Sequence, residues 1–142
     1  MNLKTAFLLF TITLIFLSCN QSKTEVNSIP KSVETDTFIK NVDSKTFKNL
    51  IDSGQGIVLD VRTLGEVSQG HIPNATVADI YQRDFVEKIN QLPKDKEVYV
   101  YCTVGARSSQ AAQVLINNGF KKVYNLNGGI IDWTRNAYPL EK

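Results

Sequence analysis

The stretch "VYVYCTVGARSS", residues 98–109, joins a strand pattern, a cysteine and the start of a helical pattern. Residues 98–101 alternate valine and tyrosine, side chains that favour a strand. Residues 107–118 carry apolar side chains at helical spacing, and a glycine follows them. Between the two patterns, Cys102 begins a loop of glycine and other small residues. We therefore expect the cysteine at the carboxyl end of a strand, directly before a helix.

Strand and helix patterns also alternate along the rest of the chain. The continuous apolar run "GIVLDV", 56–61, predicts a strand covered on both faces. Thr63, with Glu66 three residues later, predicts a short helix that begins with a capping box. This alternation predicts an α/β fold, with a central, mostly parallel sheet flanked by helices on both faces. The remaining predicted elements are helices from Ser44 to near Gly54 and over 83–92 and 128–136, and strands over 75–80, 97–102 and 122–126.

Length and composition indicate one globular domain. The chain has 142 residues, of which 42% are hydrophobic and 21% charged, as in an average soluble protein. Its net charge of +2 provides no electrostatic footprint for nucleic acid. We therefore expect no nucleic-acid partner, and nothing in the pattern predicts a metal or a cofactor.

The N-terminus has the pattern of an export signal. Lys4 precedes an uncharged, mostly apolar run over 5–17, which has the length of a signal-peptide core. The run ends in Phe16-Leu17-Ser18-Cys19, which resembles the lipobox of bacterial lipoproteins, although Phe16 stands where that motif usually has leucine. An ordinary signal peptide or membrane anchor with an incidental cysteine is the alternative.

These features predict three segments. Residues 1–18 are expected to be a lipoprotein signal peptide, 19–35 a polar, flexible tether, and 36–142 the folded domain. A lipid on Cys19 would anchor the exported protein to a membrane of the cell envelope. Cys102 would then have no disulfide partner, so its thiol would be either deeply buried or chemically useful.

Three separate motifs resemble those of the single-domain rhodaneses. They are "LDVRTLGEVSQGHIPNA" at 59–75, "YVYCTVGARS" at 99–108 and "VYNLNGGIIDW" at 123–133. The resemblance implies a parallel sheet between helices and a sulfurtransferase activity without a cofactor. It implies that a catalytic cysteine takes a sulfane sulfur from a small anionic donor such as thiosulfate. The resulting persulfide then passes the sulfur to cyanide or a thiol.

The same resemblance assigns roles to individual residues. Cys102 is the expected nucleophile and persulfide carrier, with a thiol pKa below the ordinary value because loop amides and a helix N-terminus surround it. Arg107 is the expected cation for a sulfonate group, and His71 is expected to be structural. The expected substrate-binding residues are Thr103, Val104, Gly105, Ala106 and Arg107, and the expected supporting residues are Asp60, Arg62 and Ser108.

Two other functions remain open from the sequence. Tyrosine phosphatases and arsenate reductases also place a cysteine and an arginine around an anion-binding loop, but their loop is one residue longer than the one between Cys102 and Arg107. The chain can also be a non-enzymatic binding module, as rhodanese-like domains without the cysteine are, although it retains both Cys102 and the loop from Gly105 to Arg107. For Cys102 itself, the alternative is a packed residue at the end of a strand. Thr103 and Val104 are neutral where some rhodaneses have basic residues, which weakens the case for thiosulfate as the donor.

Overall fold

The structure, a computed structural model, describes residues 36–142 and contains a five-stranded sheet in the order β1-β5-β4-β2-β3. Every neighbouring pair of strands is parallel, which confirms the predicted α/β class. The strands are β1 (Phe38–Val42), β2 (Ile57–Asp60), β3 (Thr76–Val77), β4 (Val98–Tyr101) and β5 (Lys122–Leu126). The helices are α1 (Ser44–Asp52), α2 (Leu64–Val67), α3 (Phe85–Asn90), α4 (Ala106–Asn117) and α5 (Gly129–Arg135).

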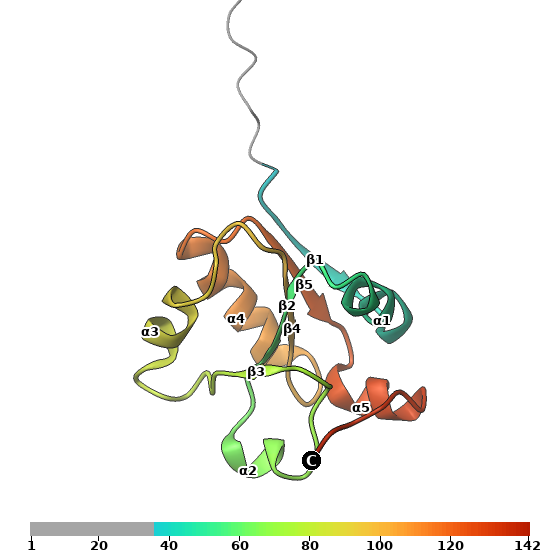
Figure 1. Ribbon diagram of the computed structural model, residues 1–142. Coiled ribbons are helices and arrows are strands. Elements are labelled where there is room, and N and C mark those ends of the chain that lie inside the picture. Colours follow the sequence, from blue (N-terminus) through green and yellow to red (C-terminus); the bar gives the residue numbers. More distant parts are fainter. Residues whose placement is uncertain (1–35) are drawn as a thin grey trace, which may run out of the picture. The chain divides into compact units, whose positions relative to one another are not determined.

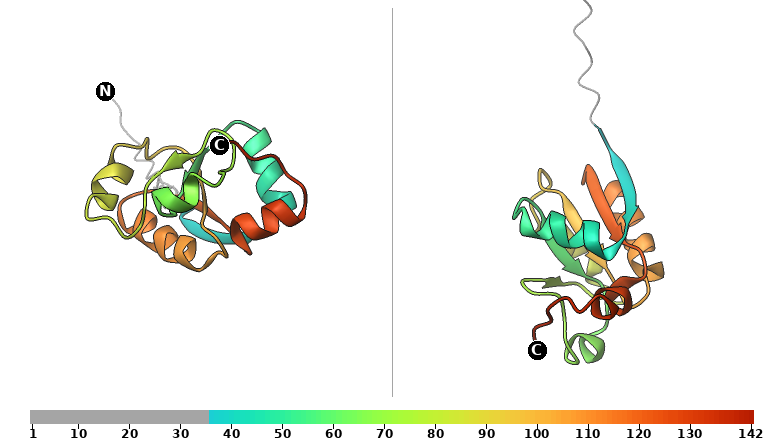
Figure 2. Two further views of the ribbon diagram at one scale, coloured as in Figure 1. Left: turned by 90° about the horizontal axis from the view of Figure 1, so that it is seen from below. Right: turned by 90° about the vertical axis from the view of Figure 1, so that its right-hand side faces the viewer.

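Helices cover both faces of this sheet (Figure 1). α3 and α4 lie on one face, and α1 and α5 lie side by side on the other (Figure 2). The short helix α2 follows β2 at the edge of the sheet where the parallel strands end. This edge therefore collects the loops after β2 and β4, the arrangement that α/β proteins use for ligand sites.

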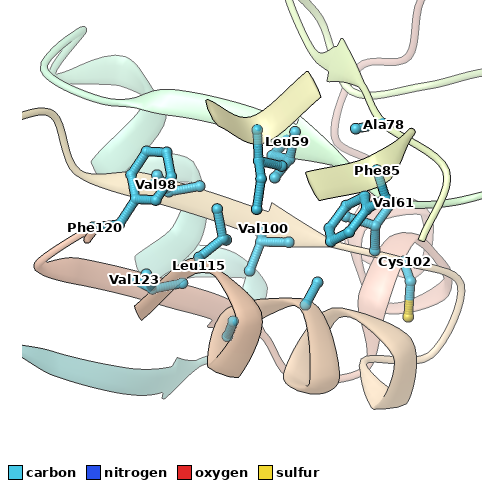
Figure 3. Close-up of a cluster of buried hydrophobic side chains, with 13 residues drawn as sticks. Leu59, Val61, Ala78, Phe85, Val98, Val100, Cys102, Leu115, Phe120 and Val123 are labelled. Atoms are coloured by element: carbon cyan, nitrogen blue, oxygen red, sulfur yellow. The ribbon is translucent and has the colours of Figure 1, made fainter. Parts of the chain in front are cut away.

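The alternation in β4 explains why its two faces have different cores. Val98 and Val100 are buried in the cluster beneath α3 and α4, whereas Tyr99 and Tyr101 are buried in the cluster beneath α1 and α5. Side chains of a strand point alternately to opposite faces, so Cys102 continues the valine side of the strand. Its sulfur lies at the end of the first cluster, next to the first turn of α4 (Figure 3).

Three details differ from the sequence-based expectations. Strand β1 was not predicted, because three of its five residues are exposed and no apolar run marks this edge strand. Asp43, not Ser44, caps α1, since its carboxylate accepts a hydrogen bond from the Thr46 amide at 2.8 Å. The strand predicted over 75–80 is limited to Thr76–Val77.

The predictions about the N-terminal segment are not tested by the structure. The signal peptide at 1–18, the lipidation of Cys19 and the tether at 19–35 all lie outside the described residues. Within residues 36–142, none of the helices has the length and apolar character that crossing a membrane requires.

Candidate active site

Cys102 is the centre of the candidate active site. It directly follows β4, and its side chain is wholly buried. The Gly105 amide donates to Sγ at 3.1 Å, and the Ser108 hydroxyl lies 3.5 Å from it. The loop and the first turn of α4 thus direct hydrogen-bond donors at one sulfur atom.

These donors change the acidity of the thiol. Burial on its own raises the pKa of Cys102, because it disfavours the charged form. Hydrogen bonds from the Ser108 side chain and from the amides of Ser108, Val104 and Gly105 outweigh this effect and leave the pKa below its ordinary value. The site therefore favours a thiolate, the reactive form of cysteine.

Gly105 allows the loop to turn this tightly. Its φ of 97° lies in the left-handed region, where side chains other than glycine are disfavoured. A Cβ atom there would lie 3.1 Å from the Leu126 carbonyl oxygen and 3.2 Å from the Gly128 nitrogen. Glycine at this position thus permits both the tight turn and the close approach of the backbone at the end of β5.

The start of α5 holds the other side of the loop. The Ile130 amide donates to the Cys102 carbonyl at 2.8 Å, and the Ile131 amide donates to the Thr103 carbonyl at 3.2 Å. Gly129 has a φ of 59°, and a Cβ atom on it would lie only 2.4 Å from the Cys102 carbonyl oxygen. This role was not predicted, although the adjacent pair of glycines at 128–129 was a signal for a close backbone approach.

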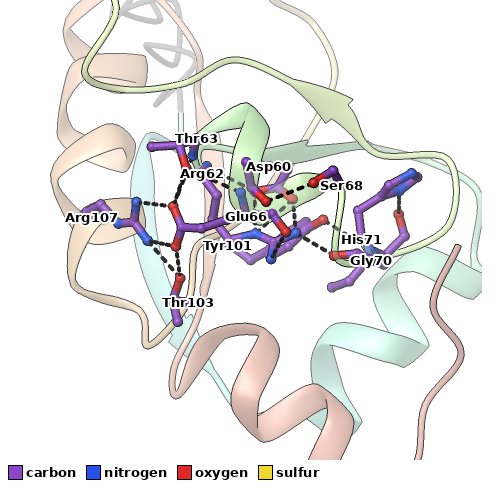
Figure 4. Close-up of polar contacts among 12 residues, drawn as sticks. Asp60, Arg62, Thr63, Glu66, Ser68, Gly70, His71, Tyr101, Thr103 and Arg107 are labelled. Atoms are coloured by element: carbon purple, nitrogen blue, oxygen red, sulfur yellow. Dashed lines mark hydrogen bonds and ion pairs between the residues drawn. The ribbon is translucent and has the colours of Figure 1, made fainter. Parts of the chain in front are cut away.

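Arg107 does not extend freely into solvent beside the cysteine. Its two terminal nitrogens donate to the two carboxylate oxygens of Glu66 at 2.8 and 2.5 Å. The Thr103 hydroxyl donates to the same carboxylate at 2.5 Å and accepts from Arg107 at 2.7 Å (Figure 4). The hydrogen bond from Arg107 lowers the pKa of Glu66 well below its usual range, and Glu66 in turn raises the pKa of Arg107.

The capping box of α2 places Glu66 at this position. Thr63 accepts from the Glu66 amide, and the Glu66 carboxylate accepts from the Thr63 amide at 3.1 Å, so this sequence prediction is confirmed. The link from the capping glutamate to Arg107 was not predicted. The capping box explains the position of Glu66 through Thr63 alone. It therefore does not indicate that the carboxylate also binds Arg107, 41 residues away.

Asp60 and Arg62 form a separate, buried ion pair. Nε and one terminal nitrogen of Arg62 donate to the carboxylate at 3.0 and 2.6 Å, and the guanidinium also donates to the Gly70 carbonyl at 2.8 Å (Figure 4). The arginine therefore ties β2 to the turn that leads to His71. His71 forms an isolated antiparallel bridge with Glu141, and its Nδ1 lies 3.1 Å from the Ile72 carbonyl.

The expected site residues thus fall into four groups. Cys102, Gly105 and Ser108 meet around the sulfur, whereas Thr103 and Arg107 meet Glu66. The side chains of Val104 and Ala106 are exposed, so these two residues contribute to the loop mainly through the backbone. Asp60 and Arg62 are occupied with each other.

In the part of the chain that the structure describes, cavities also lie outside this centre, and two of them differ in their distance from Cys102. One, of about 320 Å³, is near the amino ends of β4 and β5, far from the cysteine loop, and is lined by Ser53, Gln55, Asp95, Lys96, Glu97, Lys121 and Lys122. The other, of about 260 Å³, adjoins the start of α2 and is lined by Thr63, Leu64, Val77, Asp79, Gln82 and Lys88. Only the second shares an edge of the sheet with Cys102.

A comparison with known families identifies this arrangement. The family model described as rhodanese-like domain matches residues 43–136, which include both loops of the site. The chain belongs to the rhodanese-like domain family. A sulfurtransferase of Allochromatium vinosum is 36% identical over 104 residues, which cover 72% of this chain and 95% of that protein.

Other members differ in their printed functions. A tRNA uridine(34) hydroxylase of Cytophaga hutchinsonii is 40% identical over 97 residues, but the match covers only 31% of that enzyme. The crystal structure of a rhodanese-related protein from Thermoplasma volcanium has a TM-score of 0.64 and 30% identity, and the match covers 72% of this chain and 97% of that one. The rhodanese-like domain is therefore shared among proteins of different activity.

Proposed function

We propose that the protein is a sulfurtransferase that carries a sulfane sulfur as a persulfide on Cys102. The observation that carries this proposal is the convergence of the Gly105 amide and the Ser108 hydroxyl on Sγ, 3.1 and 3.5 Å away. Hydrogen bonds of this kind stabilise negative charge on a sulfur atom. The sulfurtransferase named among its relatives gives the proposal further support.

The proposed reaction has two displacement steps. The Cys102 thiolate attacks the sulfane sulfur of the donor, a new S–S bond forms, and the bond to the rest of the donor breaks with its electron pair. With thiosulfate, sulfite leaves. The acceptor, cyanide or a thiolate, then attacks the outer sulfur of the persulfide, and the electron pair of that S–S bond returns to Cys102. Nucleophilic catalysis of this type has ping-pong kinetics.

The loop has a distinct task in each proposed step. Before the first step, its donors favour the thiolate form of Cys102. In the persulfide, the terminal sulfur carries the negative charge, and we propose that the amides of Val104, Gly105 and Ser108, which interact with Sγ, stabilise this charge as well. The Cys102 side chain is wholly buried, so we propose that the groups that cover Sγ shift when the donor sulfur approaches.

The same burial favours a second candidate function, a non-enzymatic binding module. In that case Cys102 is a core residue at the end of a strand, in line with Val98 and Val100. The lowered thiol pKa argues against this reading, because an inert core cysteine in apolar surroundings has a raised pKa.

The rate of thiocyanate formation from thiosulfate and cyanide tests the proposal. Cys102→Ser is nearly isosteric, so we expect it to keep the fold while sulfur transfer falls to the uncatalysed background. Circular dichroism and thermal unfolding confirm the fold of the variant. Equal rates for wild type and variant would rule out Cys102 as the sulfur carrier and favour the binding module.

A further inference from the structure

Arg107, the cation beside the cysteine loop, already has an anionic partner. The Glu66 carboxylate contacts it with two oxygens on two nitrogens, at 2.8 and 2.5 Å. A sulfonate group would use the same fork of the guanidinium in the same way. Glu66 and a sulfonate-bearing donor therefore compete for one binding site on Arg107.

Arg62, which follows the neighbouring strand β2, does not supply a replacement. Arg62 is paired with buried Asp60 at 2.6 Å, and only 5% of its side chain is exposed. Both arginines thus have their charge balanced by a carboxylate. A dianion that approaches the loop also meets the negative charge of Glu66, whose side chain is 33% exposed.

Exposed apolar side chains belong to the same two connections as this ion pair, those after β2 and β4, and a further one, Tyr81, lies beside Arg107. Tyr81 is 68% exposed, and its ring centroid lies 5.8 Å from the Arg107 guanidinium carbon. Val104, in the loop itself, is 57% exposed, and Leu64, two residues before Glu66, is 73% exposed. An apolar group on the donor gains free energy when it covers such side chains, whereas a sulfonate oxygen does not.

We propose that Glu66 is a specificity-determining residue: by holding Arg107, it disfavours dianionic donors such as free thiosulfate and selects donors with one charge and an apolar group. An organic thiosulfonate has this chemistry. Its sulfane sulfur is attacked by the Cys102 thiolate, the S–S bond to the sulfonyl sulfur breaks, and the electron pair leaves with the sulfinate. This inference rests on the proposed sulfur transfer through Cys102.

Glu66→Gln tests the inference with little change in structure. Glutamine at the third position of a helix also completes a capping box, so α2 keeps its start while Arg107 loses its anionic partner. Glu87→Gln, on the exposed side of α3, removes the same charge away from the site and is the matched control.

Binding of sulfate, an unreactive dianion, reports on Arg107 without any sulfur transfer. By titration calorimetry, we expect Glu66→Gln to bind sulfate at least about tenfold more tightly than wild type, the usual size of one charge-assisted contact. Glu87→Gln should bind it as wild type does. The gain should disappear in the Arg107→Gln background, because the effect acts through that arginine.

Kinetics with a matched pair of donors give the second measurement. Methanethiosulfonate has one charge and a methyl group where thiosulfate has a further anionic oxygen. Wild type should use methanethiosulfonate with the higher kcat/KM. In Glu66→Gln the ratio of the two kcat/KM values should shift at least about tenfold toward thiosulfate.

The outcomes separate this inference from the proposed function. Sulfate binding and a donor ratio that stay at their wild-type values in Glu66→Gln would overturn the inference and leave sulfur transfer intact. A wild type that prefers thiosulfate would overturn it without recourse to any variant. If neither donor transferred sulfur to wild type, the proposed function would fall, whereas the sulfate measurement would still decide whether Glu66 blocks Arg107.

Discussion

The connection from β2 to α2, here called the first crossing, and the connection from β4 to α4, the second crossing, begin on neighbouring strands. They differ in how their charged groups are paired. After β2, the Asp60 carboxylate and the Arg62 guanidinium are both buried and fully committed to each other and to the backbone. After β4, uncharged donors converge on one titratable atom, the sulfur of Cys102. The charges of the first crossing are thus paired within the protein, whereas the donors of the second crossing surround a thiol and favour its charged form.

Glu66 and Arg107 connect the two crossings. The glutamate belongs to the first crossing and the arginine to the second. Only 18% of the Arg107 side chain is exposed. An ion pair with this geometry also orients the Thr103 hydroxyl next to the cysteine. The charge of Arg107 at this edge of the sheet is therefore balanced by a contact between the two crossings.

The largest expected effect on stability comes from breaking the first crossing. Asp60→Asn leaves Arg62 as a buried charge without its partner, which typically destabilises a protein by about 3–5 kcal/mol. We expect a decrease of this size in the free energy of unfolding, measured by chemical denaturation. Asp52→Asn, which breaks the more exposed pair with Lys48, should change it by less than about 1 kcal/mol. Similar losses in both variants would contradict the structural role of the Asp60 pair.

The second effect concerns the backbone that supports the second crossing. Gly129→Ala places a Cβ atom against the Cys102 carbonyl in a left-handed conformation, which by backbone strain alone destabilises by roughly 1–3 kcal/mol. We also expect a large loss of sulfur transfer, because the Cys102 loop must shift from its position to make room for the Cβ atom. Gly119→Ala is the control: its φ of 93° brings similar strain, but its Cβ meets nothing within 4 Å. Equal activity in the two variants would show that α5 does not position the loop.

The smallest effect is a change in the acidity of Cys102. Ser108→Ala removes a hydroxyl whose hydrogen bond lowers the thiol pKa, so the pKa should rise. The rate of alkylation against pH should shift to higher pH by the same amount, because less thiolate is present at neutral pH. The exposed neighbour gives the control Ser109→Ala, which should leave the profile unchanged. An unshifted profile in Ser108→Ala would mean that the amides alone stabilise the thiolate.

Sequence patterns predicted what is local in this molecule. The β4 strand, the helix that follows Cys102 and the Thr63–Glu66 capping box each arise from neighbouring residues, and the structure confirms all three. The strand β1 was missed, because an exposed edge strand lacks an apolar run.

The features that were not predicted depend on contacts between distant segments. The occupation of Arg107 by Glu66 joins residues 41 positions apart, and the packing of Gly129 against the Cys102 carbonyl joins two different loops. Each of these contacts joins residues from two different sequence motifs, so neither motif alone predicts it. Full burial of Cys102, which the sequence left as one of two alternatives, also depends on distant segments, since its side chain belongs to the core cluster that α3 and α4 cover.

The intact mass of the domain after incubation with a sulfane-sulfur donor tests the central claim most directly. The account predicts that wild type gains one sulfur atom, that peptide mapping places it on Cys102, and that cyanide removes it again. Cys102→Ser should gain none. A wild type that acquires no sulfur from thiosulfate or from methanethiosulfonate, or that acquires it equally after Cys102→Ser, would contradict the account.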